Sequence, residues 1–135
     1  YRTKGKYFTT KVVTVFQNTI ADRSSIISSS VSVFDSSNGD MVATMDGESI
    51  TSLRTGAATG LATMLLAKKD ATAAAIFGTG VQAHTQVEAI ISSRPINKIF
   101  VFGRNIDSIK KFSSYISETY SLSSCPGTFN DLNSL

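Results

Sequence analysis

A glycine-rich turn at residues 78–83 constrains the fold more than any other feature of the 135-residue sequence. The turn reads Gly78-Thr79-Gly80-Val81-Gln82-Ala83 and fits the pattern G-x-G-x-x-G/A. It follows the wholly apolar run Ala73–Phe77, which is typical of a strand buried on both faces. A helix is predicted from Val81 to Ser93, because the proline of Arg94-Pro95 disfavours helix in the residue before it. This order of strand, turn and helix favours a parallel α/β sheet.

The turn also has the physical properties of a dinucleotide-binding loop. Gly78 permits a tight turn, Gly80 lets the backbone approach a pyrophosphate, and Ala83 permits close packing of helix on strand. The N–H groups and the dipole at a helix N-terminus favour a diphosphate. The sequence therefore predicts a dinucleotide site at this turn. The residues leave one alternative open, a glycine-bearing turn with no ligand.

The rest of the second half continues the same pattern. Lys98–Phe102 is predicted to be a second parallel strand, and Asn105 is predicted to cap a helix that follows. One face of that helix is apolar and carries Ile106, Ile109, Phe112, Ile116 and Tyr120. From Ser121 onward we expect only a loop and then the start of a helix. Residues 73–120 thus predict two parallel strands, Ala73–Phe77 and Lys98–Phe102.

The loop after the second strand bears on the choice of cofactor. It reads Gly103-Arg104-Asn105 and has no carboxylate before Asp107. NAD-binding folds usually have an acidic residue here that binds the ribose hydroxyls, whereas an arginine can pair with a 2′-phosphate. We therefore favour NADP(H), with NAD(H) as the second possibility. The alternative is that Arg104 simply lies in a solvated loop.

The first half predicts an antiparallel sheet followed by one long helix. The predicted strands are residues 12–16, 30–34 and 41–45, and Asn38-Gly39 favours a tight hairpin between the last two. A helix is predicted from Ser49 as N-cap, with one apolar stripe made by Ile50, Leu53, Ala57, Leu61 and Met64. Residues 56–63 are rich in small side chains. This composition reflects either simple variation or close backbone packing against another element.

Composition excludes several classes of function. A formal net charge of +3, without a block of basic residues, argues against a nucleic-acid partner. A single cysteine excludes an intrachain disulfide and a Cys-based zinc cluster, and a single histidine excludes a His-rich metal site, so we predict no metal. The cysteine usage fits a reducing, cytoplasmic compartment. No apolar run approaches the roughly 20 residues that span a bilayer, so no membrane partner is predicted.

Three further expectations concern single residues. The chain begins at Tyr1 without a methionine or a secretory signal pattern, so we expect an interior segment of a longer protein. His84 is predicted to lie on a helix surface. Cys125 is predicted to lie in a loop with no catalytic role.

Two basic residues are candidates for binding an anion. Lys11, placed directly before the first predicted strand, is either an exposed edge charge or a functional group. Arg54 lies among small residues of the long helix, and a tightly packed guanidinium needs an anionic partner because an unpaired buried charge is costly. If Lys11 is functional, the two residues together would form a clamp for the carboxylate of an amino-acid-like substrate.

The stretch Met45–Ala58, with its pattern M-D-G-x-x-x-T-x-x-R-T, and the downstream G-x-G-V-Q-A at residues 78–83 resemble the ornithine cyclodeaminase/mu-crystallin family. The resemblance extends from about Lys11 to Arg104. It implies a two-domain NAD(P)-dependent α/β protein, usually a homodimer joined through its substrate-domain sheets. Residues 1–70 would be part of an antiparallel-sheet substrate/dimerisation domain with its linking helix. Residues 71–135 would be the first half of a Rossmann-type NAD(P)-binding domain.

The resemblance also implies roles for individual residues. Lys11 matches the family lysine that contacts the substrate carboxylate and assists proton movement. Arg54 matches the arginine at the junction of substrate and nicotinamide. Cofactor contacts are implied for Gly78, Thr79, Gly80, Val81 and Gln82 at the diphosphate and for Gly103, Arg104 and Asn105 around the adenosine ribose. A cofactor-binding Ser or Thr of several members falls on Ile26 by ungapped counting; neither Ser25 nor Ser28 is assigned in its place.

The implied function is hydride transfer at the α-carbon of a small amino acid or its imine. Ketimine reductases, amino-acid dehydrogenases and cyclodeaminases all occur in the family. Two alternatives remain: a nucleotide- or small-ligand-binding protein without turnover, and an inactive fragment. The resemblance puts the second Rossmann half and the catalytic aspartate of the cyclodeaminases beyond residue 135. We therefore expect these 135 residues alone to be inactive.

Overall fold

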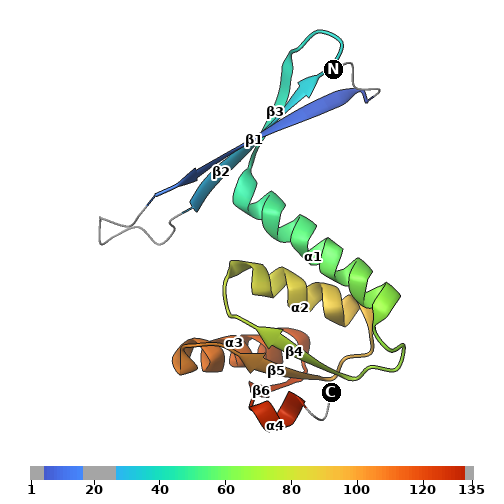
Figure 1. Ribbon diagram of the computed structural model, residues 1–135, viewed down its shortest axis with the longest axis vertical. Helices are drawn as coiled ribbons and strands as arrows, with labels where there is room; N and C mark the ends of the chain where they lie inside the picture. Colours follow the sequence, from blue (N-terminus) through green and yellow to red (C-terminus); the bar gives the residue numbers. More distant parts are fainter. Residues whose placement is uncertain (1–4, 17–26, 133–135) are drawn as a thin grey trace. The chain divides into compact units, whose positions relative to one another are not determined.

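The computed structural model describes residues 5–16 and 27–132, which form two compact units, 1–51 and 52–135 (Figure 1). The division falls inside helix α1 (Gly47–Leu66), whereas the sequence predicts a boundary near residue 70. The assignment of the two parts to a substrate/dimerisation domain and a cofactor-binding domain stays a prediction. None of the helices in these two described stretches is long and apolar enough to cross a membrane.

The first unit contains the predicted antiparallel sheet. Its strands β1 (Tyr7–Val15), β2 (Ile27–Asp35) and β3 (Met41–Asp46) pair in the order β1-β2-β3. The β2–β3 hairpin turns through Gly39 at φ +81°, a left-handed conformation that glycine adopts without strain. Strand β1 starts five residues earlier than predicted, so Lys11 lies within an edge strand and not before it.

Helix α1 begins directly after β3, and the prediction of Ser49 as its N-cap is wrong. The Asp46 carboxylate accepts a hydrogen bond of 2.7 Å from the backbone N–H of Ser49. Asp46 therefore satisfies one of the N–H groups at the helix start that have no partner within the helix. The charge of this carboxylate also suits the positive end of the helix dipole.

The packed face of α1 is made of small residues and not of the predicted apolar stripe. Ser52, Gly56 and Gly60 are buried, whereas Leu53, Leu61 and Met64 of the stripe are 54–64% exposed. A Cβ added at Gly56 would lie 2.8 Å from the backbone oxygen of Thr85, and one added at Gly60 would lie 3.3 Å from the Ala89 Cβ. The small residues therefore permit close backbone packing of α1 against α2, as one of the two sequence interpretations predicted.

The second unit is a three-stranded parallel sheet with helices (Figure 1). Strands β4 (Ala73–Phe77), β5 (Lys98–Phe102) and β6 (Ser123–Pro126) pair in that order. Helix α2 (Val81–Ser93) follows β4, α3 (Ile106–Tyr120) follows β5, and the short α4 (Phe129–Leu132) follows β6. The prediction of only two parallel strands is wrong, because the serine-rich segment after α3 pairs with β5.

The core of this unit lies between the sheet and helices α2 and α3. Strands β4 and β5 contribute alternate residues to it, as the period of two in a strand requires. The core consists of Ile76, Ala83, Val87, Ile96, Ile99, Val101, Ile109, Phe112 and Ile116. Its position holds the N-termini of α2 and α3 against the carboxyl ends of the strands that precede them.

Candidate functional site

The glycine-rich turn joins β4 to α2, as predicted, and its two glycines have different geometries. Gly78 has φ +103°, which side chains rarely permit, and its N–H donates a 2.7 Å hydrogen bond to the carbonyl of Phe102 at the end of β5. Gly80 has extended backbone, and a Cβ added there would meet nothing within 4 Å. Backbone strain explains the first glycine, whereas neither strain nor a crowding protein neighbour explains the second.

The first turn of α2 exposes groups that suit an anion. Gly80 is the N-cap residue and makes no side-chain capping bond, so the helix start has no capping side chain of its own. Val81 and Gln82 are exposed, and the buried Ala83 packs into the core, which confirms the predicted close helix–strand contact. This arrangement of backbone N–H groups at a helix N-terminus matches the chemistry of a diphosphate.

The segment after β5 lies beside this turn. The bond between Gly78 and Phe102 ties the ends of β4 and β5 together, and the Phe77 and Phe102 rings stack with centroids 4.8 Å apart. A Cβ added at Gly103 would lie 3.2 Å from Ile109 and 3.9 Å from the methyl group of Thr79. The structure thus brings Gly78–Gly80 and the start of the 103–105 segment together at the carboxyl ends of β4 and β5.

Two residues of the 103–105 segment have distinct structural settings. Arg104 is exposed. Asn105 caps α3 as predicted, because its side-chain oxygen accepts a 2.9 Å hydrogen bond from the N–H of Ser108. Its amide oxygen therefore has a structural role in helix α3, and contact with a ribose stays a prediction for both residues.

Lys11 is exposed on β1, and its ammonium group reaches the first turn of α1. It donates to the carbonyl oxygen of Gly47 at 3.5 Å and to the side-chain oxygen of Thr51. The hydrogen bonds from Ser49 hold the pKa of the Asp46 carboxyl below its ordinary value, and the nearby Lys11 charge lowers it slightly further. Sequence reasoning missed Thr51, although it is the threonine of the M-D-G-x-x-x-T pattern.

Arg54 lies on α1 in a setting that differs from the prediction. We expected a tightly packed guanidinium, but Arg54 is exposed. The reason is its place on the helix: Ser52, Gly56 and Gly60 face α2, and a position two residues after Ser52 points away from that face. Because Arg54 is exposed, its charge does not require an anionic partner, and its role rests on the family pattern alone.

Ile26 and Ser25 lie outside the described residues, and Ser28 is an exposed residue of β2.

The remaining titratable candidates have structural settings. His84 is half-buried and not on the open surface as predicted, with its ring edge-on to Phe112 at 4.8 Å and to Tyr115 at 4.5 Å. Cys125 is a free, half-buried thiol in β6 and not in a loop. In the stretches that the structure describes, no group of three or more His, Cys, Asp or Glu residues could hold a metal ion.

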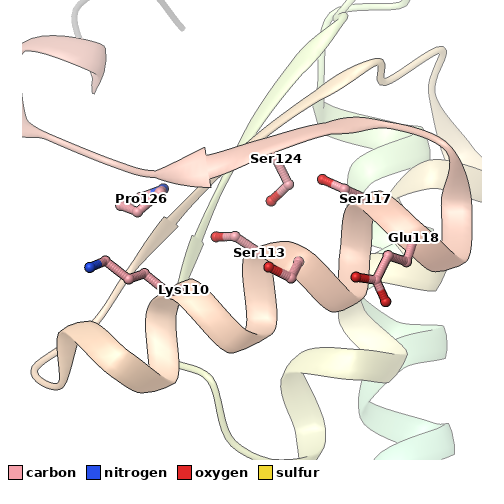
Figure 2. A pocket seen from close by; sticks show the side chains of 7 residues that line it. Lys110, Ser113, Ser117, Glu118, Ser124 and Pro126 are labelled. Atoms are coloured by element: carbon pink, nitrogen blue, oxygen red, sulfur yellow. The ribbon is translucent and has the colours of Figure 1, made fainter.

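A groove of about 450 Å³ lies between α3 and β6 and is separate from the glycine-rich turn. Figure 2 shows the side chains of Ser113 and Ser124 in the space between these two elements. Both hydroxyl oxygens are buried and have no hydrogen-bond partner among the described residues. A ligand in the groove does not reach these two oxygens, because neither has exposed surface. Its lining residues are Lys110, Ser113, Ser114, Ser117, Glu118, Ser124 and Pro126.

The parallel unit, with a glycine-rich turn between its first strand and its first helix, has the architecture of the first half of a Rossmann-type domain. Residues 1–127 match the ornithine cyclodeaminase/mu-crystallin family, and the chain belongs to this family.

Three relatives illustrate the match. The Delta(1)-pyrroline-2-carboxylate reductase of Bacillus thuringiensis subsp. konkukian is 36% identical over 110 residues, which are 82% of this chain and 34% of the relative. The ketimine reductase mu-crystallin of Mus musculus is 33% identical over 108 residues, which are 80% of this chain and 34% of the relative. The solved structure of Thermococcus litoralis Delta(1)-pyrroline-2-carboxylate reductase in complex with NADH and L-proline has a TM-score of 0.79 and 34% identity, and the alignment covers 89% of this chain and 38% of that one. The chain spans about a third of the length of the curated relatives it matches.

Proposed function

We propose that the full-length protein is an NAD(P)-dependent oxidoreductase that acts on a small amino acid or its imine. The observation that carries the proposal is the open space above Gly80, where a Cβ would meet nothing within 4 Å and the backbone is unstrained. A glycine at this position is explained by the close approach of a ligand to the backbone. Membership of the ornithine cyclodeaminase/mu-crystallin family supports the same reading.

The residues present fit a nicotinamide dinucleotide. The backbone at Gly78, Thr79, Gly80, Val81 and Gln82 would hold the diphosphate at the N-terminus of α2, and Gly103, Arg104 and Asn105 would lie along the adenosine ribose. We propose NADP(H) as the preferred cofactor, because the exposed Arg104 guanidinium suits a 2′-phosphate and no carboxylate competes at that position. When bound, the nicotinamide supplies or accepts the hydride at the α-carbon of the substrate.

We propose that two basic residues bind the substrate. In this proposal the guanidinium of Arg54 binds the substrate carboxylate beside the nicotinamide, and the ammonium of Lys11 binds the carboxylate and donates a proton to the nitrogen as the imine is reduced. Two relatives, a pyrroline-2-carboxylate reductase and a ketimine reductase, support an imino-acid substrate. The direction of the reaction, including cyclising deamination, depends on the rest of the protein.

A homodimer and a cytoplasmic location complete the proposal. The antiparallel sheet supports a dimer, because Val12, Val13 and Val15 of its edge strand are 50–68% exposed. Such an apolar surface on an edge strand is typical of a covered interface.

The test is a fluorescence titration of the full-length protein with NADPH and with NADH, followed by turnover of cyclic imino acids. Arg104→Asp should weaken NADPH binding relative to NADH by about 10- to 100-fold, because charge-assisted hydrogen bonds contribute about 1.5–3 kcal/mol. Lys111→Asp makes the same change of charge on the exposed side of α3 and should leave the NADPH:NADH ratio unchanged. If neither nucleotide binds the wild-type protein, the proposal is refuted. If NADPH binds and no imino acid is turned over, the protein is a nucleotide-binding protein without this activity.

A further inference from the structure

A chain of hydrogen bonds connects Lys11 to the first turn of α1. The Thr51 hydroxyl donates to the carbonyl oxygen of Gly47 at 2.6 Å. Because a hydroxyl has a single hydrogen, its lone pairs are the part of Thr51 that faces the Lys11 ammonium, which donates to them. The same ammonium also donates to the Gly47 carbonyl at 3.5 Å. Thr51 and Gly47 therefore form one two-point acceptor for Lys11.

The sheet register explains why these groups meet. Lys11 pairs with Val31 across β1 and β2, and Val31 pairs with Met45 across β2 and β3, so the three residues form one row. Gly47 follows β3 immediately, and a Cβ there would lie 2.3 Å from the Ser29 hydroxyl and 2.8 Å from its backbone. Only a glycine lets the helix start approach the sheet this closely. The first turn of α1 is thereby held within reach of the lysine side chain.

We infer that Thr51 is a positioning residue for Lys11, an inference that rests on the proposed function. A lysine side chain on an exposed edge strand has four rotatable bonds and many conformations. The two acceptors in α1 restrict the ammonium to one place and engage two of its three N–H bonds. Neither acceptor engages the third N–H bond, which in this inference meets a substrate carboxylate or imine nitrogen.

A purely structural role for Thr51 is the competing explanation, and the same helix offers a matched control. Thr63 makes the same kind of bond, from its hydroxyl to the carbonyl of Thr59 at 2.8 Å, and no lysine of the described residues donates to it. Replacing either threonine by valine removes a hydroxyl from α1 and keeps the branched shape. Only Thr51→Val also removes an acceptor from Lys11.

The experiment measures steady-state kinetics of the full-length protein with a cyclic imino acid and its preferred nicotinamide nucleotide. Thr51→Val should lower kcat/KM by about 10- to 100-fold, the usual consequence of a misplaced reacting group, and Thr51→Ser should recover it to within about threefold. Thr63→Val should match the wild type, and nucleotide affinity should be the same in all variants. In a Lys11→Gln background, Thr51→Val should have no further effect on kcat/KM.

A second measurement does not depend on turnover. Acetic anhydride labelling of Lys11, followed by mass spectrometry with Lys110 as internal reference, should be faster in Thr51→Val than in Thr63→Val because the ammonium has lost an acceptor. The inference is overturned if Thr51→Val behaves like Thr63→Val in both measurements, or if Thr51→Ser is as impaired as Thr51→Val. A wild-type protein that turns over no imino acid refutes the proposed function instead, and the labelling result then decides the Lys11–Thr51 contact by itself.

Discussion

Replacing Gly56 by alanine tests the close packing of α1 against α2. The added Cβ would lie 2.8 Å from the carbonyl oxygen of Thr85 and 3.0 Å from its Cβ. Ordinary contact begins at 3.4 Å, so the helices must separate by about 0.6 Å. Thr85 also donates a 2.9 Å hydrogen bond to the carbonyl of Ser52, and that separation strains it. The obstructing atom is backbone, so no side-chain rotation relieves the contact.

Opposing effects determine how much Gly56→Ala changes the free energy of unfolding. Alanine favours a helix interior by about 1 kcal/mol relative to glycine. Overpacking of a tight contact costs about 1–3 kcal/mol, and loss of the Ser52–Thr85 hydrogen bond costs about 1 kcal/mol more. Gly56→Ala should therefore reduce the free energy of unfolding by about 1–3 kcal/mol. Gly60→Ala is the matched control, because its Cβ would meet the Ala89 methyl at 3.3 Å and needs a shift of about a tenth of an ångström. We expect its propensity gain to offset that small cost.

The measurement is urea unfolding of the full-length protein, followed by circular dichroism at 222 nm. With a typical dependence of about 1–3 kcal/mol per molar urea, Gly56→Ala should lower the midpoint by about 1 M, while Gly60→Ala should leave it unchanged or slightly raised. Equal stability of the two variants would refute the reasoning, since helix propensity alone predicts the same gain at both positions. A Gly56→Ala protein more stable than the wild type would show that α1 and α2 are less closely packed.

Substitutions at three further residues test the ends of the helices. The hydrogen bonds from Ser49 lower the pKa of Asp46 from its ordinary value of 3.8. The stability that the ionised Asp46 contributes is therefore present above pH 3.8 and is lost as the pH falls through the lower pKa of the folded state. Asp46→Ala should lower the urea midpoint at pH 7, and this difference from the wild type should vanish in strong acid. Arg94 donates to three carbonyls at the end of α1 at 2.7–3.0 Å, so Arg94→Met should reduce the free energy of unfolding by about 1–3 kcal/mol and Arg94→Lys by less, measured in the same way. Asn105→Ala removes the cap on Ser108 and should reduce the free energy of unfolding by about 1 kcal/mol, whereas no change in the midpoint would mean that water replaces the cap.

Strong local signals in the sequence predicted much of the second unit. The order of β4, α2, β5 and α3 follows from apolar runs, a glycine turn and a capping asparagine, which are all local features. Strand β6 was missed because Ser123–Pro126 has no apolar alternation. An edge strand with one neighbouring strand needs little apolar alternation. The backbone of β6 pairs with Lys98–Val101 whatever its side chains are.

Helix α1 shows where periodicity misleads. Its stripe of large apolar residues predicts a buried face, but the face that packs on α2 is Ser52, Gly56 and Gly60. Two helix backbones approach closely only where side chains are small, so the contact selects glycine and serine over leucine. The prediction that Arg54 is tightly packed was wrong for the same reason. Its neighbours in the sequence are small, but Arg54 points away from the face on which they pack.

The sequence predicted those parts of the candidate site in which the backbone conformation requires a particular residue. It did not predict contacts between side chains that are far apart in the sequence. Lys11 and Thr51 are 40 positions apart and are brought together by a sheet register that no local pattern encodes, so their hydrogen bond emerges only from the fold. Glycines show the same division. The sequence indicates that Gly78, Gly80 and Gly103 are special, but one needs a left-handed φ, one has open space, and one avoids the Ile109 side chain. Of the three, only Gly80 has no explanation among the described residues, and the diphosphate that we propose at the N-terminus of α2 would supply one.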